Sequence, residues 1–140
     1  MKQAQASWKR EVLASHVLPP AHFRYSPVVR VGSFVFLSGM VALDPENGQL
    51  IEGDAGAQTA QILANVRALL DEQGWRLGQL VLARIYCADF SAFGLINRAW
   101  DAFFGAQEPP ARTSVGVAAL PLGALVEIEF QLAIEAETAA

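Results

Sequence analysis

The residues best suited to chemistry lie near the C-terminal end of the chain, where apolar and acidic side chains alternate. Glu127, Glu129, Gln131 and Glu135 are interleaved with Val126, Ile128, Phe130, Leu132 and Ile134. A period of two places the two sets on opposite faces of a strand. If the acidic face lies inside an oligomer, Glu127 or Glu129 would be partly buried there and could position a water or act as a general base. The alternative is the solvated polar face of an edge strand, and the pattern alone favours this alternative.

Arg112 begins another predicted strand, directly after residues 109–111. Its guanidinium can bind a carboxylate through two parallel hydrogen bonds, although an arginine at a strand end is more often a surface charge. Ser114 lies two residues on and shares its face; we interpret it as polar lining, because no nucleophile motif surrounds it. Tyr25 and Ser26 could offer hydroxyls to a ligand or only satisfy backbone groups.

Several other chemistries are excluded by residue type. The only histidines are His16 and His22, so neither a three-histidine metal site nor a His-x-x-x-His zinc helix is available. Cys87 is the only cysteine, and its apolar neighbours predict a buried, inert thiol. The chain has no glycine-rich phosphate or dinucleotide motif. We therefore expect neither a metal nor a cofactor.

Periodicity and turn residues predict the elements that position these side chains. Strands are expected at 28–31, 33–41, 80–89, 111–119 and 124–135, and the inward set of the third is predicted to be Val81, Ala83, Ile85 and Cys87. Apolar residues at helical spacing predict one helix over 54–73, capped by Asp54 and Gly74, and a second from Ser91 as the N-cap to Gly105. Residues 1–24 are predicted to be an irregular lead-in to a single domain spanning 1–140.

This order, strand, strand, helix, strand, helix, strand, strand, predicts an α+β fold with two βαβ crossovers on one mixed sheet. Right-handed crossovers place both helices on the same face of such a sheet. Residues 34–37 are apolar in succession, so bulky groups must also lie on the uncovered face. The sequence therefore predicts a homo-oligomer that buries this face.

The composition limits the classes of partner and the cellular compartment that we expect for the protein. The chain has 140 residues, of which 53% are hydrophobic and 17% charged, with a net charge of −4. It is long and apolar enough for one folded domain, and it has no basic cluster for nucleic acid. We find no apolar run long enough for a membrane span and no signal peptide, and a single cysteine offers no internal disulfide. A cytoplasmic protein is expected.

Short motifs, each weak alone, occur in an order and spacing that is similar to one family. They are Tyr25-Ser26, residues 35–39, residues 44–48, Gly53-Asp54, Gln58-Thr59, Asn65, Asp89, Phe93, Asn97, Phe103-Phe104, residues 110–112, Leu120-Pro121 and residues 126–129. In these the sequence resembles the RidA/YjgF family of reactive-intermediate deaminases, also labelled the endoribonuclease L-PSP family. The resemblance implies a chorismate-mutase-like fold of the bacillus type and a homotrimer with an inner barrel of sheets.

The resemblance also implies a reaction and its residues. The reaction is cofactor-free hydrolysis of 2-imino or 2-enamino acids, such as 2-aminoacrylate, to 2-keto acids and ammonia, in clefts between subunits. Arg112 would hold the substrate carboxylate and Glu127 the water, while Tyr25, Gly39, Asn97 and Ser114 would line the cleft. The sequence departs from the family pattern at Phe23, Arg24, Met40 and Ser114. Arg112 favours a ligand with a carboxylate, and Phe23, Arg24 and Met40 could reshape the cleft for one larger than 2-aminoacrylate.

Two alternatives remain. A non-catalytic metabolite-binding or regulatory trimer would use the same cleft for a small carboxylic acid. Ribonuclease activity, another label of the family, fits the negative charge poorly.

Overall fold

The computed structural model describes residues 8–135, which form one six-stranded sheet and two α-helices. The elements in chain order are β1 (Glu11–Val12), β2 (Val28–Val31), β3 (Phe34–Met40), α1 (Ala55–Gln73), β4 (Leu80–Cys87), α2 (Phe93–Phe104), β5 (Ala111–Gly116) and β6 (Val126–Ala133). Short 3₁₀ turns lie at η1 (Leu77–Gln79), η2 (Phe90–Ala92) and η3 (Pro121–Gly123).

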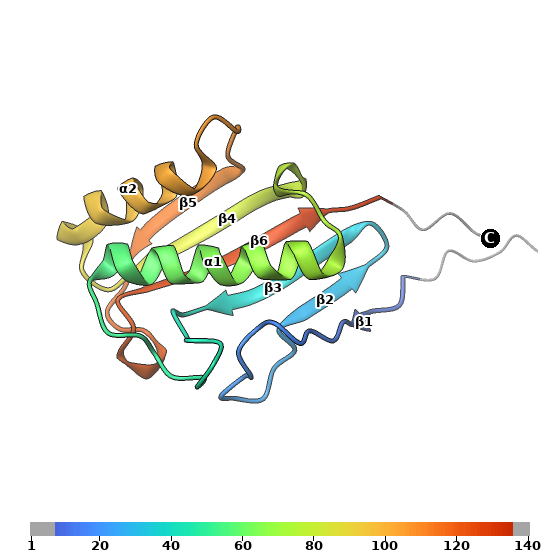
Figure 1. Ribbon diagram of the computed structural model, residues 1–140, viewed down its shortest axis with the longest axis horizontal. Coiled ribbons are helices and arrows are strands. Elements are labelled where there is room, and N and C mark those ends of the chain that lie inside the picture. Colours follow the sequence, from blue (N-terminus) through green and yellow to red (C-terminus); the bar gives the residue numbers. More distant parts are fainter. Residues whose placement is uncertain (1–7, 136–140) are drawn as a thin grey trace, which may run out of the picture.

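The strands follow the order β1-β2-β3-β6-β4-β5, and both helices lie on the same face of the sheet (Figure 1). Strand β6 is antiparallel to both of its neighbours, so β3 and β4 run parallel on either side of it. Strand β5 pairs with β4 in parallel. The units β3-α1-β4 and β4-α2-β5 are therefore the two expected crossovers, and the predicted α+β fold is confirmed.

Helix α1 has the limits that its sequence predicts. The Asp54 carboxylate accepts a hydrogen bond from the Ala57 amide at 2.8 Å, and Gly74 ends the helix in the left-handed region at φ 73°. Its apolar stripe, which includes Ile62, Leu63, Val66, Leu69 and Leu70, is fully buried against the sheet. Truncating one of these leucines to alanine would cost about 2–5 kcal/mol.

The start of α2 differs from its prediction. Ser91 is not the N-cap: the Asp89 carboxylate accepts from the Ser91 amide at 3.0 Å and from its hydroxyl at 2.6 Å, which forms η2. The α-helix begins two residues later, at Phe93. An aspartate that precedes the serine competes better for the free amides of the first turn, because its carboxylate is charged.

The outer part of β4 also corrects the predicted alternation. Ala83, Ile85 and Cys87 are buried as expected, but Val81 is 40% exposed, whereas Leu80 is buried. The register against β6 shifts between Leu80 and Leu82, so one extra residue turns Val81 to the other face. Strands β3 and β6 are shorter than predicted at both ends, and β4 and β5 end earlier than predicted.

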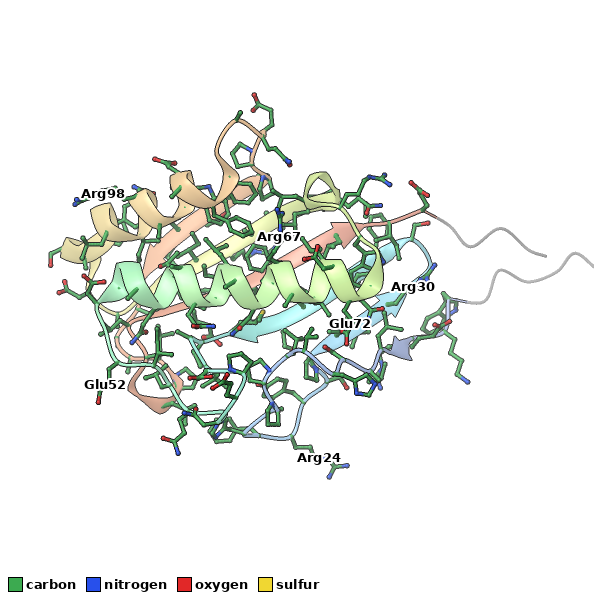
Figure 2. All side chains as sticks on the ribbon, in the orientation of Figure 1. Arg24, Arg30, Glu52, Arg67, Glu72 and Arg98 are labelled. Atoms are coloured by element: carbon green, nitrogen blue, oxygen red, sulfur yellow. The ribbon has the colours of Figure 1, made fainter. Side chains whose placement is uncertain are left out.

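The segment before β2 is more ordered than an irregular lead-in. Strand β1 pairs with β2 at the edge of the sheet, with Glu11 opposite Arg30. The carboxylate of Glu72, near the end of α1, accepts hydrogen bonds from the Ser15 hydroxyl and the His16 amide, both at 2.7 Å. Figure 2 shows Glu72 where α1 meets this segment. These contacts hold the chain beside α1 as it approaches Tyr25.

The face of the sheet without helices carries large apolar side chains. Phe34, Phe36, Val81 and Val115 are each 40–49% exposed there. Exposed aromatic side chains on one sheet face are typical of an interaction surface. Among the described residues, no helix is long and apolar enough to span a membrane.

Candidate functional site

A pocket of about 280 Å³ opens where β3 ends beside β6. Its polar lining includes Glu127, Ser38 and Tyr25, and Gly39 lies beside them. The remaining lining is His22, Phe23, Val41, Leu43, Pro121 and Leu122. A smaller cavity of about 50 Å³ shares Tyr25, Ser38 and Gly39 with it and reaches the buried Asn65. Concave, mostly apolar pockets with a few polar groups are the usual form of small-molecule sites.

Gly39 sits against the Glu127 carboxylate. A Cβ at position 39 would lie only 2.5 Å from Glu127 Oε1 and 2.9 Å from its Cδ. Only glycine leaves room for the carboxylate in this position. The register of β3 shifts between Leu37 and Met40, and this irregularity turns the glycine toward β6.

The electrostatics of the pocket favour a proton-handling carboxyl. Burial, and then repulsion from the Glu129 charge, raise the pKa of Glu127 above its usual range. Burial, and then the Glu127 charge, raise the pKa of Tyr25, so its phenol remains protonated near neutral pH. Within residues 8–135, no hydrogen bond occupies the Glu127 carboxylate. This group is therefore free to bind water or substrate.

Glu129 shares the open face of β6 with Glu127 but has other partners. The Tyr86 hydroxyl donates to its Oε1 at 2.5 Å, and an Arg84 guanidinium nitrogen lies 3.6 Å from the same oxygen. The hydrogen bond to this carboxylate raises the pKa of Tyr86. Glu129 is thus occupied by its neighbours on β4, and Glu127 is the carboxylate that faces the pocket.

Arg112 lies in a second cluster, made by β5 and α2. Its guanidinium stands 5.5 Å from the Phe93 ring centre and 5.2 Å from that of Trp100, and donates to Asn97 Oδ1 at 2.9 Å. The three helix residues lie one turn apart on the same face of α2. Cation–π contacts and one hydrogen bond fix the side chain and leave further N–H donors for an anion.

Ser114 belongs to this second cluster by position. It lies opposite Ile85 of β4, whereas Arg112 lies opposite Ala83, so both serine and arginine point to the helix-covered face. The Ser114 hydroxyl oxygen is buried and has no hydrogen-bond partner among the described residues. The hydrogen-bonding capacity of this hydroxyl is therefore unused within the described part of the chain.

The six residues expected at the site thus form two groups in one chain. Tyr25, Gly39 and Glu127 meet in the pocket, whereas Asn97, Arg112 and Ser114 cluster with α2. Glu127 lies opposite Tyr86 on the open face of the sheet, and Arg112 points to the covered face. The two groups therefore do not face one another within a single copy.

Sequence reasoning missed three contributors. Phe93 was named only among the family motifs and Trp100 only fell within the second predicted helix, yet the rings of both support Arg112. Their spacing around Asn97 was an available signal. Leu122 lines the pocket from the loop before β6. Within residues 8–135, no group of three or more His, Cys, Asp or Glu side chains could hold a metal ion.

Comparisons of the sequence and the structure with known proteins identify relatives of this chain. The family model described as "Endoribonuclease L-PSP" matches residues 16–134. A RutC family protein of Pyrococcus abyssi is 34% identical over 120 residues, which cover 86% of this chain and 94% of that protein. The mouse 2-iminobutanoate/2-iminopropanoate deaminase is 36% identical over 120 residues, 86% of this chain and 88% of the mouse protein. The crystal structure of RidA from the Antarctic bacterium Psychrobacter superimposes with a TM-score of 0.82 at 36% identity, over 89% of this chain and 99% of that one.

Proposed function

The chain belongs to the endoribonuclease L-PSP family, also known as the RidA/YjgF family, and from this premise we propose that it is a deaminase of 2-imino acids. Its substrates would be reactive imines, and the enamines that tautomerise to them, released by other enzymes. The observation that carries the proposal is the pair of half-sites: an arginine fixed for a carboxylate, and an unoccupied glutamate in a pocket.

We propose that a second copy of the chain completes each half-site. Arg112 and Glu127 point to opposite faces of the sheet, so a small substrate can reach both only between copies. The exposed apolar face, with Phe34 and Phe36, supplies a surface for this assembly. A homotrimer in which each copy offers its Arg112 to a neighbour's Glu127 would complete three equivalent sites.

Each end of the substrate has a complementary group. The carboxylate would receive two parallel hydrogen bonds from Arg112, whose orientation Asn97 and the two rings fix in advance. The buried Ser114 hydroxyl would donate to the same carboxylate. Holding the carboxylate in this way would place the imine carbon beside Glu127. The entropy of orienting the substrate would then be lost on binding and not during the reaction.

Glu127 would then direct the addition of water. As the water oxygen bonds to the imine carbon, its proton passes to the carboxylate, and the imine nitrogen takes up a proton to give a carbinolamine. The carbinolamine hydroxyl then gives its proton, by way of Glu127, to the amino nitrogen; the carbon–oxygen double bond forms as the carbon–nitrogen bond breaks and ammonia leaves. The products are one 2-keto acid and one ammonia for each imine and water consumed. The imine carbon is already electrophilic, so these steps require no metal or cofactor.

The test is a trapping competition. An amino-acid oxidase acting on leucine releases an imine that semicarbazide traps as a semicarbazone; a deaminase slows this signal by consuming the imine first. We expect slowing by the wild type and its loss in Arg112→Ala, by about 100-fold or more, because the carboxylate is no longer positioned. Size-exclusion chromatography of the variant reports whether the oligomer is intact.

Arg98→Ala is the matched control. Arg98 lies on the same helix as Asn97 but is exposed and points away from the molecule (Figure 2), with its Nε 3.4 Å from the Gly94 carbonyl oxygen. This variant should slow trapping as the wild type does. Saturable binding of a keto acid without any slowing would instead support the non-catalytic metabolite-binding alternative.

A further inference from the structure

The segment before β2 forms part of the pocket wall, although none of it is deeply packed. We call residues 13–27 the strap. Residues of the strap that line the pocket or the smaller cavity beside it are Leu18, Pro19, His22, Phe23, Tyr25 and Pro27. Every residue of the strap is half-buried or exposed. Burial of apolar surface therefore holds the strap only weakly, and its position depends on hydrogen bonds to the rest of the chain.

Ser38 holds the C-terminal end of the strap. Its hydroxyl donates to the Ser26 carbonyl oxygen at 2.7 Å, and its amide donates to the Pro27 carbonyl oxygen at 2.9 Å. In the middle of the strap, His22 Nε2 lies 2.6 Å from the Gly48 carbonyl oxygen. Neither contact reaches the N-terminal part of the strap.

Glu72, near the end of α1, holds this N-terminal part. Its Oε1 accepts from the Ser15 hydroxyl and its Oε2 from the His16 amide, both at 2.7 Å. The Ser15 hydroxyl oxygen accepts in turn from the amides of Val17 and Leu18, at 3.3 and 3.2 Å. Because the hydroxyl donates its proton to the carboxylate, its lone pairs face these amides, and the hydrogen bonds strengthen one another. Through Ser15, Glu72 thus fixes the backbone that places Leu18 in the cavity wall.

The charge of Glu72 strengthens this contact. The hydrogen bonds from His16 and Ser15 hold the pKa of Glu72 below its usual range, so its carboxylate is ionised at neutral pH. Hydrogen bonds to an ionised acceptor are about twice as strong as those between neutral groups. Another contact of α1 with the strap, from Gln73 Nε2 to the Ala14 carbonyl oxygen, joins neutral groups and is longer, at 3.2 Å.

We propose that Glu72 is a positioning residue for the pocket, and that it acts by holding the strap where its side chains complete the wall beside Glu127. Glu72 is not itself among the residues that line either cavity. Its effect on turnover therefore passes through the strap. This effect rests on the proposed deaminase activity, whereas the hold of Glu72 on the strap is measurable without it.

Two measurements on Glu72→Ala test this proposal. In hydrogen–deuterium exchange, peptides from residues 13–25 should exchange about tenfold faster than in the wild type, as the loss of a hydrogen bond to a charged group predicts. Peptides from α1 should be unchanged. In trapping competition, kcat/KM for the leucine imine should fall about tenfold, mainly through KM, because wall contacts bind substrate and transition state alike. A loss of overall stability would lower the unfolding temperature and leave KM unchanged.

Glu72→Gln is the conservative variant. The glutamine Oε1 can accept from the His16 amide, and its Nε2 can donate to the Ser15 hydroxyl oxygen, so both contacts persist without the charge. Since neutral hydrogen bonds are about half as strong, KM should rise only about threefold. The exchange of residues 13–25 should likewise fall between those of the wild type and Glu72→Ala.

Asp71→Ala is the matched control. Asp71 precedes Glu72 on the same exposed turn, and its side chain makes no hydrogen bond within residues 8–135. Its exchange and KM should equal those of the wild type.

The outcomes separate this proposal from the proposed function. Unchanged exchange of residues 13–25 in Glu72→Ala would overturn the hold of Glu72 on the strap. Faster exchange with a wild-type KM would overturn its role at the pocket, and either result would leave the deaminase intact. A wild type without turnover would overturn the proposed function, while the exchange comparison would still test the hold on the strap.

Discussion

Glu127 and Glu129 are two residues apart on β6, yet their surroundings differ. Tyr86 and Arg84 hold Glu129, whereas Glu127 faces the pocket next to Gly39. The sequence could not separate the two, because both occur on the same face with the same spacing. The distinction depends on which residues of β4 lie opposite, and this follows from the register between strands.

The charge of Glu129 predicts how the activity depends on pH. Burial and the Glu129 charge raise the pKa of Glu127, and only the ionised form accepts a proton from water. Activity should therefore fall as pH decreases through this raised pKa. Glu129→Gln removes the repulsion and lowers the pKa of Glu127, so the acid side of the kcat/KM profile should move to lower pH. Burial is unchanged in this variant and still keeps the pKa of Glu127 above its usual range.

The control for this profile is Glu135→Gln. Glu135 follows the same strand but is exposed and pairs with Arg76 at 2.9 Å, outside the pocket. Its profile should coincide with that of the wild type. An acid limb that stays in place in Glu129→Gln would mean that Glu127 is not the group whose titration limits the reaction.

At the scale of elements, local signals were sufficient for α1 but not for the sheet edges. The caps at Asp54 and Gly74 act within a few residues, so the sequence predicts both ends of the helix. The short β1 and the turn of Val81 to the open face depend on partner strands that are distant in sequence. No local pattern contains this information.

The close approach of β3 to β6 predicts the effect of one methyl group. In Gly39→Ala the new Cβ would lie 2.5 Å from Glu127 Oε1, so the carboxylate must move. The displaced atoms are the end of a flexible side chain, so stability should change little. Activity should fall about 100-fold, because a shift of about 1 Å in a catalytic group has this effect. Trapping competition and thermal unfolding measure the two quantities.

Gly78→Ala is the matched substitution for this experiment. A Cβ there meets no atom within 4 Å, and Gly78 has no positive φ. It should leave both activity and unfolding temperature close to the wild type. Full activity in Gly39→Ala would show that the observed position of the Glu127 carboxylate is not required.

At the scale of the whole molecule, the sequence predicted the two covering helices and the apolar open face, but not how the site residues divide. All six lie on strands, loops or helices that the periodicity predicts. Their separation into two groups depends on side-chain direction across three neighbouring strands. Arg112 lies opposite the buried Ala83 and shares its face of the sheet, whereas Glu127 lies opposite Tyr86 and shares the other face. The alternation of side chains along one strand does not determine which residues of the neighbouring strand share the same face.

This division predicts complementation between two inactive variants. Arg112→Ala retains Glu127, and Glu127→Gln retains Arg112, so each variant alone should lack turnover. When the two are co-expressed and assemble at random, a site between copies receives an intact arginine in about half of cases and an intact glutamate in about half, independently. About a quarter of wild-type activity should therefore return. The two variants purified separately and mixed without exchange are the control and should remain inactive. If the co-expressed chains form mixed oligomers by native mass spectrometry and still show no turnover, then Arg112 and Glu127 do not act on one substrate from neighbouring copies.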